Sequence, residues 1–123
     1  MKKILIIEDE LQVMDAYEKK LRKDGFEVIS ARTSDEGLRL AKISGPDLII
    51  LDILLPGTMS GIGVLKSIKL DEDIKNVPIL MLTNLDSSEI EARDLGVADY
   101  IIKSNISIDG VVARVRQCLA EKR

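Results

Sequence analysis

The chain has 123 residues and a formal net charge of −3, and 46% of its residues are hydrophobic. A chain of this length buries about two-thirds of its unfolded surface, which is enough for one compact domain. Histidine is absent, which excludes a Ser-His-Asp triad, a Cys-His pair and a histidine metal site. The acidic balance and the scarcity of aromatic residues argue against direct binding of nucleic acid.

The single cysteine, Cys118, cannot form an internal disulfide, which favours a reducing intracellular setting. The apolar run from Ile4 to Ile7 is too short for the core of a signal peptide. No apolar stretch approaches the roughly 20 residues that are needed to cross a bilayer. We therefore expect a cytoplasmic protein without a membrane segment.

Short apolar runs alternate with amphipathic stretches along the whole chain. This pattern is typical of a doubly wound α/β fold, in which helices cover both faces of a parallel sheet. The predicted strands are Lys3 to Ile7, Phe26 to Ser30, Asp47 to Asp52, Pro78 to Thr83 and Tyr100 to Ile102.

The amphipathic segments between these runs predict helices. In the first, from about Leu11 to Lys23, apolar residues recur at steps of three and four: Leu11, Met14, Tyr17 and Leu21. The second begins at Thr33 or Ser34, each of which can cap it. We expect its inward-facing residues to be Leu38, Ala41 and Ile43.

The third predicted helix is short and contains Val64, Leu65 and Ile68, after a glycine-rich loop over Pro56 to Gly63. Capping candidates for the fourth are Asp86, Ser87 and Ser88. The last helix covers about Ile108 to Ala120, and the basic residues Lys122 and Arg123 then favour the helix dipole.

Four of the predicted strands end in polar residues: Glu8 and Asp9, Asp52, Thr83, and Lys103. In a parallel sheet these ends share one edge, and ligand sites form there, where the strand order reverses. For five strands that point commonly lies between the first and third. We therefore expect Glu8, Asp9 and Asp52 to face one another, with Thr83 and Lys103 beyond them. Each residue alone has a structural explanation, such as capping, so the convergence carries the argument.

The three carboxylates and one ammonium of this cluster carry a formal charge of −2. Two like charges about 4 Å apart repel by roughly 4 kcal/mol at an effective dielectric of 20, so the cluster favours a divalent cation. Carboxylate oxygen is a preferred ligand of Mg²⁺. Asp52 is the candidate nucleophile toward phosphorus. Lys103 would pair with Asp52 in the empty site and with a phosphoryl oxygen in the filled one, and Thr83 offers a hydroxyl.

Four stretches carry a family resemblance, in matching order and spacing: residues 4–10, 46–52, 78–83 and 95–103. Through them the sequence resembles the receiver domain of two-component response regulators, the CheY-like family, over essentially its whole length. The resemblance implies a flavodoxin-like sheet of order 2-1-3-4-5 and one receiver domain over residues 1–123. It implies a phosphoacceptor signalling domain, not an enzyme, that catalyses only its own phosphotransfer and dephosphorylation.

The resemblance also implies a role for each site residue. Asp52 accepts a phosphoryl group from a histidine kinase or histidine phosphotransfer protein, assisted by Lys103. Glu8 and Asp9 hold Mg²⁺ together with Asp52 and the backbone carbonyl of Leu54.

Thr83 and Tyr100 correspond to the family's switch pair. The hydroxyl moves toward the phosphoryl group and the ring turns inward, which changes the surface of the fourth helix, fifth strand and fifth helix. Output would pass through an effector protein or an output domain that this sequence does not include. We expect a monomer that can dimerise through this surface on phosphorylation, with Asp99 and Arg114 as candidate partners.

The chain departs from the family pattern at several positions. Ser104 replaces a proline whose peptide bond is often cis, and we expect a trans bond here because a cis bond before serine costs roughly 3 kcal/mol. The loop from Pro56 to Gly61 is one residue longer, which affects recognition by the kinase. Asn84 stands where a small residue is usual. Leu54 and Leu85 line the approach of water with apolar groups, so our hypothesis is slow dephosphorylation.

Other functions compete with this interpretation. One is a receiver-like interaction module that works without phosphorylation. A phosphatase or phosphomutase with an aspartate nucleophile would commonly have a second aspartate at the position of Leu54. A flavin-binding domain would need a phosphate-binding loop after the first strand, where Glu8, Asp9 and Glu10 repel phosphate.

Overall fold

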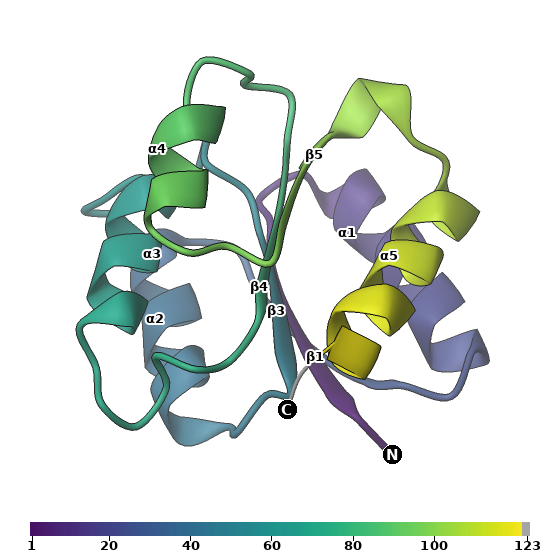
Figure 1. Cartoon of the computed structure of the whole chain (residues 1–123). Helices are drawn as coiled ribbons and strands as arrows, with labels where there is room; N and C mark the ends of the chain where they lie inside the picture. The colour runs from purple at the N-terminus through teal and green to yellow at the C-terminus, as the bar shows by residue number, and fades with distance from the viewer. Residues whose placement is uncertain (122–123) are drawn as a thin grey trace.

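The structure is a computed structural model that describes residues 1–121. Lys122 and Arg123, predicted to follow the last helix, lie outside the described residues. The strands and helices alternate along the chain (Figure 1). In order, they are β1 (Lys3–Ile7), α1 (Leu11–Lys23), β2 (Glu27–Ala31), α2 (Ser34–Ile43), β3 (Leu48–Leu51), α3 (Gly61–Lys69), β4 (Ile79–Thr83), α4 (Glu89–Asp94), β5 (Asp99–Ile102), the 3₁₀ turn η1 (Lys103–Asn105) and α5 (Ile108–Glu121).

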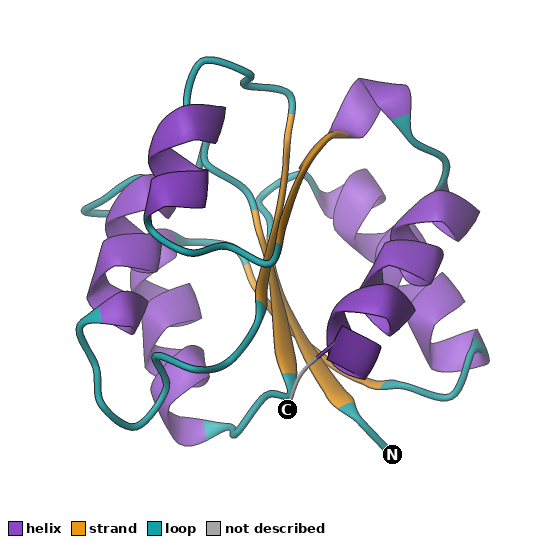
Figure 2. Cartoon of the chain, in the orientation of Figure 1, coloured by secondary structure: helices purple, strands orange, loops and turns teal. Residues whose placement is uncertain are grey.

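The five strands form one parallel sheet in the order β2-β1-β3-β4-β5, as predicted. Helices α1 and α5 cover one face of the sheet, and α2, α3 and α4 cover the other (Figures 1 and 2). The inner strands are therefore buried on both faces, which explains their continuous aliphatic runs. All residues of β3 and β4 are buried.

The core consists of two hydrophobic clusters, one on each face of the sheet. Ile4 and Ile6 belong to the cluster under α1 and α5, whereas Leu5 and Ile7 belong to the cluster under α2, α3 and α4. Successive strand residues point to opposite faces, so one aliphatic run supplies both clusters.

Two predicted core residues lie instead at the surface. Ile43 is 66% exposed and Leu11 is 54% exposed. Ile43 follows the buried Ala41 by two residues, or roughly 200° around the helix, so the prediction that both face inward was wrong. Leu11 is the first residue of α1, at the edge of the sheet that carries the polar cluster.

The ends of the helices follow local capping chemistry. The Thr33 hydroxyl accepts a hydrogen bond of 3.1 Å from the backbone N–H of Glu36, as expected for the cap of α2. Ser88 occupies the N-cap position directly before α4, but its side chain makes no capping hydrogen bond. β2 begins one residue later than predicted, because the N–H of Phe26 bonds to the carbonyl of Leu21 and belongs to the end of α1.

None of the helices within residues 1–121 combines the length and apolar character that would let it span a membrane.

The loop after β3 returns close to the strand that it leaves. The N–H of Gly61 donates to the carbonyl of Ile53 over 2.8 Å. A Cβ at Gly61 would lie 1.9 Å from the backbone oxygen of Asp52. The loop is also fastened to α2, because the N–H of Thr58 donates to Asp35 Oδ2 over 3.0 Å. Gly61 is therefore required by the close approach of α3 to the end of β3.

We expect Gly61→Ala to lower the free energy of unfolding by about 1–3 kcal/mol, because the added methyl group forces two backbone segments apart. The matched control is Gly63→Ala, two residues further along α3, whose added methyl would lie 2.8 Å from the Cβ of Met59 in the preceding loop and not against a backbone oxygen at 1.9 Å. A gain in helix propensity of about 0.5–1 kcal/mol partly offsets that contact, so we expect Gly63→Ala to lose less stability than Gly61→Ala. Urea denaturation measures both, and equal stabilities of the two variants would contradict the prediction.

Candidate functional site

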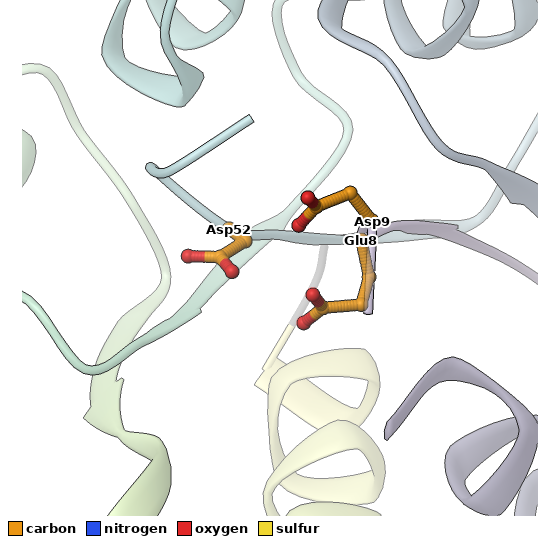
Figure 3. Close-up of side chains that lie close together, drawn as sticks. All are labelled: Glu8, Asp9 and Asp52. Carbon is orange, nitrogen blue, oxygen red and sulfur yellow. The ribbon is translucent and has the colours of Figure 1, made fainter. Parts of the chain in front are cut away.

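The polar cluster lies at the carboxyl edge of the sheet. β1 and β3 pair in parallel with Ile7 opposite Leu51, so the next residues, Glu8 and Asp52, leave the sheet side by side. Figure 3 shows the carboxylates of Glu8, Asp9 and Asp52 gathered at these two strand ends. The β4–α4 loop and the η1 turn lie along the same edge, which faces away from the N-terminus (Figure 1). The predicted convergence of these residues is therefore present.

The three carboxylates form a compact group of acidic oxygens. One oxygen from each of Glu8, Asp9 and Asp52 lies within 4.8 Å of the others. Glu8 and Asp52 are only 3% and 4% exposed, and Asp9 is half-buried. Several hard oxygen donors at one partly open position fit a divalent metal ion of the Mg²⁺ type. The group could thus hold such an ion.

Lys103 supplies the positive charge that the carboxylates need. Its Nζ lies 2.7 Å from Asp52 Oδ2 and 2.5 Å from Glu8 Oε1, and its side chain is 9% exposed. Glu10 Oε1 lies 3.6 Å from the same atom. The sequence predicted the pairing with Asp52, whereas the contact with Glu10 was missed. Its only signal was a third acidic residue directly after Glu8 and Asp9.

Burial and charge pairing act in opposite directions in this group. Burial raises the pKa of Glu8, although the hydrogen bonds from Lys103 and from the N–H of Glu10 partly offset it. Burial alone would lower the pKa of Lys103, but hydrogen bonds to Asp52 and Glu8, and their charges, raise it above the ordinary lysine value. Lys103 therefore stays charged at neutral pH.

The Asp52 carboxylate is held through both of its oxygens. Oδ1 accepts hydrogen bonds from the backbone N–H groups of Ile53 at 2.7 Å and Leu54 at 3.3 Å, and Oδ2 accepts from Lys103. The side chain of Leu54 is 60% exposed. That the Leu54 carbonyl binds a metal stays a prediction.

Thr83 and Tyr100 meet at the backbone of Leu85. Thr83 ends β4 and is fully buried, and its Oγ1 accepts a hydrogen bond of 3.3 Å from the N–H of Leu85. The Tyr100 hydroxyl donates to the carbonyl of Leu85, and the ring is 6% exposed. Burial raises the pKa of Tyr100. Both side chains therefore contact one short segment of the β4–α4 loop.

Asn84 and Ser104, two departures from the family pattern, contact each other. The N–H of Ser104 donates to Asn84 Oδ1 over 3.0 Å. There is no cis peptide bond among the described residues, so the Lys103–Ser104 bond is trans, as predicted. The sequence flagged each residue but not their contact, because they are 20 positions apart on different loops.

The comparisons with known sequences agree with this geometry. Residues 4–116 match the family model of the response regulator receiver domain. The chain is 37% identical over 120 residues to the alkaline phosphatase synthesis transcriptional regulatory protein PhoP of Bacillus subtilis, a match that covers 96% of this chain and 48% of PhoP. The chain spans about half the length of the curated relatives it matches.

Solved structures match over nearly the whole chain. A CheY-like response regulator receiver domain protein from Methanospirillum hungatei has a TM-score of 0.91 at 27% identity, covering 99% of this chain and 96% of that one. The response regulator TrrA of Thermotoga maritima has a TM-score of 0.84 at 28% identity, covering 96% and 99%. From its sequence match, its strand order and its fold, this chain belongs to the receiver domains of the response regulators of two-component systems.

Proposed function

We propose that residues 1–123 act as one receiver domain and as a phosphorylation-activated switch. Asp52 accepts a phosphoryl group from the phosphohistidine of a histidine kinase or a histidine phosphotransfer protein. The observation that carries this proposal is the environment of Asp52, which is 4% exposed and accepts a hydrogen bond from the Lys103 ammonium. Its carboxylate also lies within 4.8 Å of the acidic oxygens of Glu8 and Asp9.

The metal in this proposal is Mg²⁺, held by Glu8, Asp9, Asp52 and the carbonyl of Leu54. Bound there, it would neutralise the acidic group and lower the repulsion between Asp52 and an incoming phosphoryl group. The donor set of three carboxylates supports this choice. The structure of TrrA is described as a complex with Mg²⁺ and a beryllofluoride, which also supports it.

The residues of this chain divide the work of the transfer. A carboxylate oxygen of Asp52 forms the new bond to phosphorus, and the bond from phosphorus to the donor's imidazole nitrogen breaks. The Lys103 ammonium, which contacts Asp52 Oδ2 beforehand, moves to a phosphoryl oxygen. The hydroxyl of Thr83 donates to another. Both groups stabilise charge on the phosphoryl oxygens as the transfer proceeds.

The same hydroxyl connects the reaction to the surface. At present Thr83 Oγ1 accepts a hydrogen bond from the N–H of Leu85. When the hydroxyl turns toward the phosphoryl group, that hydrogen bond breaks. The Tyr100 hydroxyl donates a hydrogen bond to the carbonyl of Leu85. Displacement of Leu85 would therefore also move the Tyr100 ring. The changed surface comprises α4, β5 and α5.

The partners follow from this surface and from the length of the relatives. PhoP is named as a transcriptional regulatory protein and is about twice as long as the matched region. We propose that output passes through an effector domain or a separate effector protein and that this domain does not itself bind nucleic acid. Dimerisation through α4, β5 and α5 would have to accommodate Asp99, which already pairs with Arg114 within the chain.

Incubation with a small-molecule phosphodonor and Mg²⁺ is expected to add one phosphoryl group to the wild-type chain and none to Asp52→Asn, because the amide is not a nucleophile. Omitting Mg²⁺ should also abolish the adduct. Intact mass spectrometry measures both. The control is Asp47→Asn, whose carboxylate accepts a hydrogen bond from Lys3 at the opposite edge of the sheet and which should be modified like wild type. An unmodified wild type under every condition would favour the phosphorylation-independent interaction module.

We expect Lys103→Met to lower the free energy of unfolding by about 3–5 kcal/mol at neutral pH without Mg²⁺, because Glu8 and Asp52 lose their counter-charge. The pKa of Lys103 is raised on folding, so its stabilisation is complete below the ordinary value of 10.5 and is lost as pH rises through the folded value. The difference between the two proteins should therefore shrink at strongly alkaline pH.

Urea titrations from neutral to strongly alkaline pH measure this difference. The control is Lys75→Met, which removes an exposed ion pair of 2.9 Å with Glu72 and should cost less than about 1 kcal/mol. If Lys103→Met costs no more than Lys75→Met, the charge-balancing role of Lys103 is wrong.

The apolar side chains of Leu54 and Leu85 are expected to make the phosphorylated form decay slowly, because neither can orient the attacking water. Leu54→Asn or Leu85→Glu should speed the decay about tenfold, the effect of one added hydrogen bond to that water. The control is Leu70→Asn, at a residue that is 84% exposed in another part of the fold. Loss of the phosphoryl adduct with time measures the rate, and a wild type that decays as fast as these variants would refute the hypothesis.

A further inference from the structure

One hydrogen bond joins the two loops that carry the proposed phosphoryl-binding side chains. The N–H of Ser104 donates to Asn84 Oδ1 over 3.0 Å. Asn84 directly follows Thr83, the last residue of β4, and Ser104 directly follows Lys103, the first residue of η1 after β5. The bond therefore connects the neighbours of Thr83 and Lys103 across the edge of the sheet.

The chemistry of the η1 turn explains why this bond forms. The first N–H groups of any helical turn have no partner within the turn. Ser104 lies at the start of η1, whose first carbonyl, that of Lys103, accepts from the N–H of Ile106 over 3.4 Å. The Asn84 amide oxygen satisfies the Ser104 N–H, as a capping side chain would, but from a different loop. A proline at position 104 would have no N–H to donate.

Both ends of this link are anchored in the sheet and the site. Thr83 is buried and pairs with Ile102 across β4 and β5. On the other side, Lys103 is held at its Nζ by Asp52 and Glu8. The sheet fixes the backbone just before Asn84, and the carboxylates fix the end of the Lys103 side chain. The hydrogen bond from Ser104 to Asn84 then limits the remaining movement of the η1 turn.

We propose that Asn84 is a positioning residue, which fixes Lys103 relative to Thr83 through the Ser104 amide. Its effect on phosphoryl transfer rests on the proposed function, whereas its coupling to Lys103 does not. Asn84 belongs to neither of the loops that carry Glu8, Asp9 and Asp52. Its loss should therefore slow the transfer, which uses Lys103 and Thr83, and leave Mg²⁺ affinity nearly unchanged.

Three variants separate the hydrogen bond from other effects. Asn84→Ala removes the acceptor. Ser104→Pro removes the donor but also makes a cis bond accessible before residue 104, so the double variant below supplies its control. Ser104→Ala changes the side chain and keeps the N–H. With a small-molecule phosphodonor at saturating Mg²⁺, we expect the first two to slow phosphorylation about three- to tenfold, the value of one hydrogen bond. Ser104→Ala should stay within about twofold of wild type, because its amide still reaches Asn84.

The double variant Asn84→Ala/Ser104→Pro provides the strictest form of this test. Both substitutions break the same bond, so the double variant should be no slower than the slower single variant. Isothermal titration calorimetry with Mg²⁺ alone should give dissociation constants within about twofold of wild type. A wild-type rate for Asn84→Ala, multiplicative losses in the double variant, or an equal loss of Mg²⁺ affinity would each overturn the proposal.

A stability cycle tests the coupling to Lys103 without any phosphorylation. Lys103→Met should raise the unfolding equilibrium constant in both backgrounds, but by a factor at least about threefold smaller in the Asn84→Ala background than in wild type, since Lys103 is then less firmly held. If wild type forms no phosphoryl adduct but this coupling is found, the proposed function fails and the positioning role stands. If wild type is phosphorylated and the two substitutions are independent, the positioning role is wrong.

Discussion

The in-register pairing of β1 with β3 places Glu8 beside Asp52, and the remaining features of the site depend on this constraint. Ile7 lies opposite Leu51, and both strands are buried on both faces by helices. Slipping the register by one residue would exchange the side chains between the two faces of the sheet. The apolar burial of the strands thus holds together carboxylates that repel each other, and this repulsion is what makes the cluster suitable for a cation.

Lys103 makes this arrangement compatible with folding. Its ammonium is a compact charge on a flexible stem, so one Nζ reaches both Asp52 and Glu8. A buried charge pair contributes little net stability compared with apolar packing, but breaking it leaves unpaired charges behind. The group that balances the carboxylates is also the group that we propose for the phosphoryl oxygens. In this proposal, stability and chemistry depend on the same side chain.

In the proposed switch, the route from the site to the surface runs through backbone atoms of one residue, Leu85. The N–H of Leu85 donates to Thr83 Oγ1, and its carbonyl accepts from the Tyr100 hydroxyl. In this proposal, movement of one side chain therefore shifts the residue that the other contacts. At the start of β5, the N–H of Tyr100 donates to Asp99 Oδ1 over 2.9 Å, and Asp99 pairs with Arg114 of α5.

The sequence by itself determined the strands, their parallel arrangement and the polar cluster, because burial on two faces leaves continuous aliphatic runs and the polar residues directly follow them. It identified Glu8 and Asp52 for the same reason. It placed Ile43 wrongly inside, since a short helix gives few turns from which to judge a face. Only the tertiary structure decided the contact of Asn84 with Ser104. This contact joins segments that follow two different strands, so it depends on how the sheet positions the ends of those strands. A local sequence pattern carries no information about that distance.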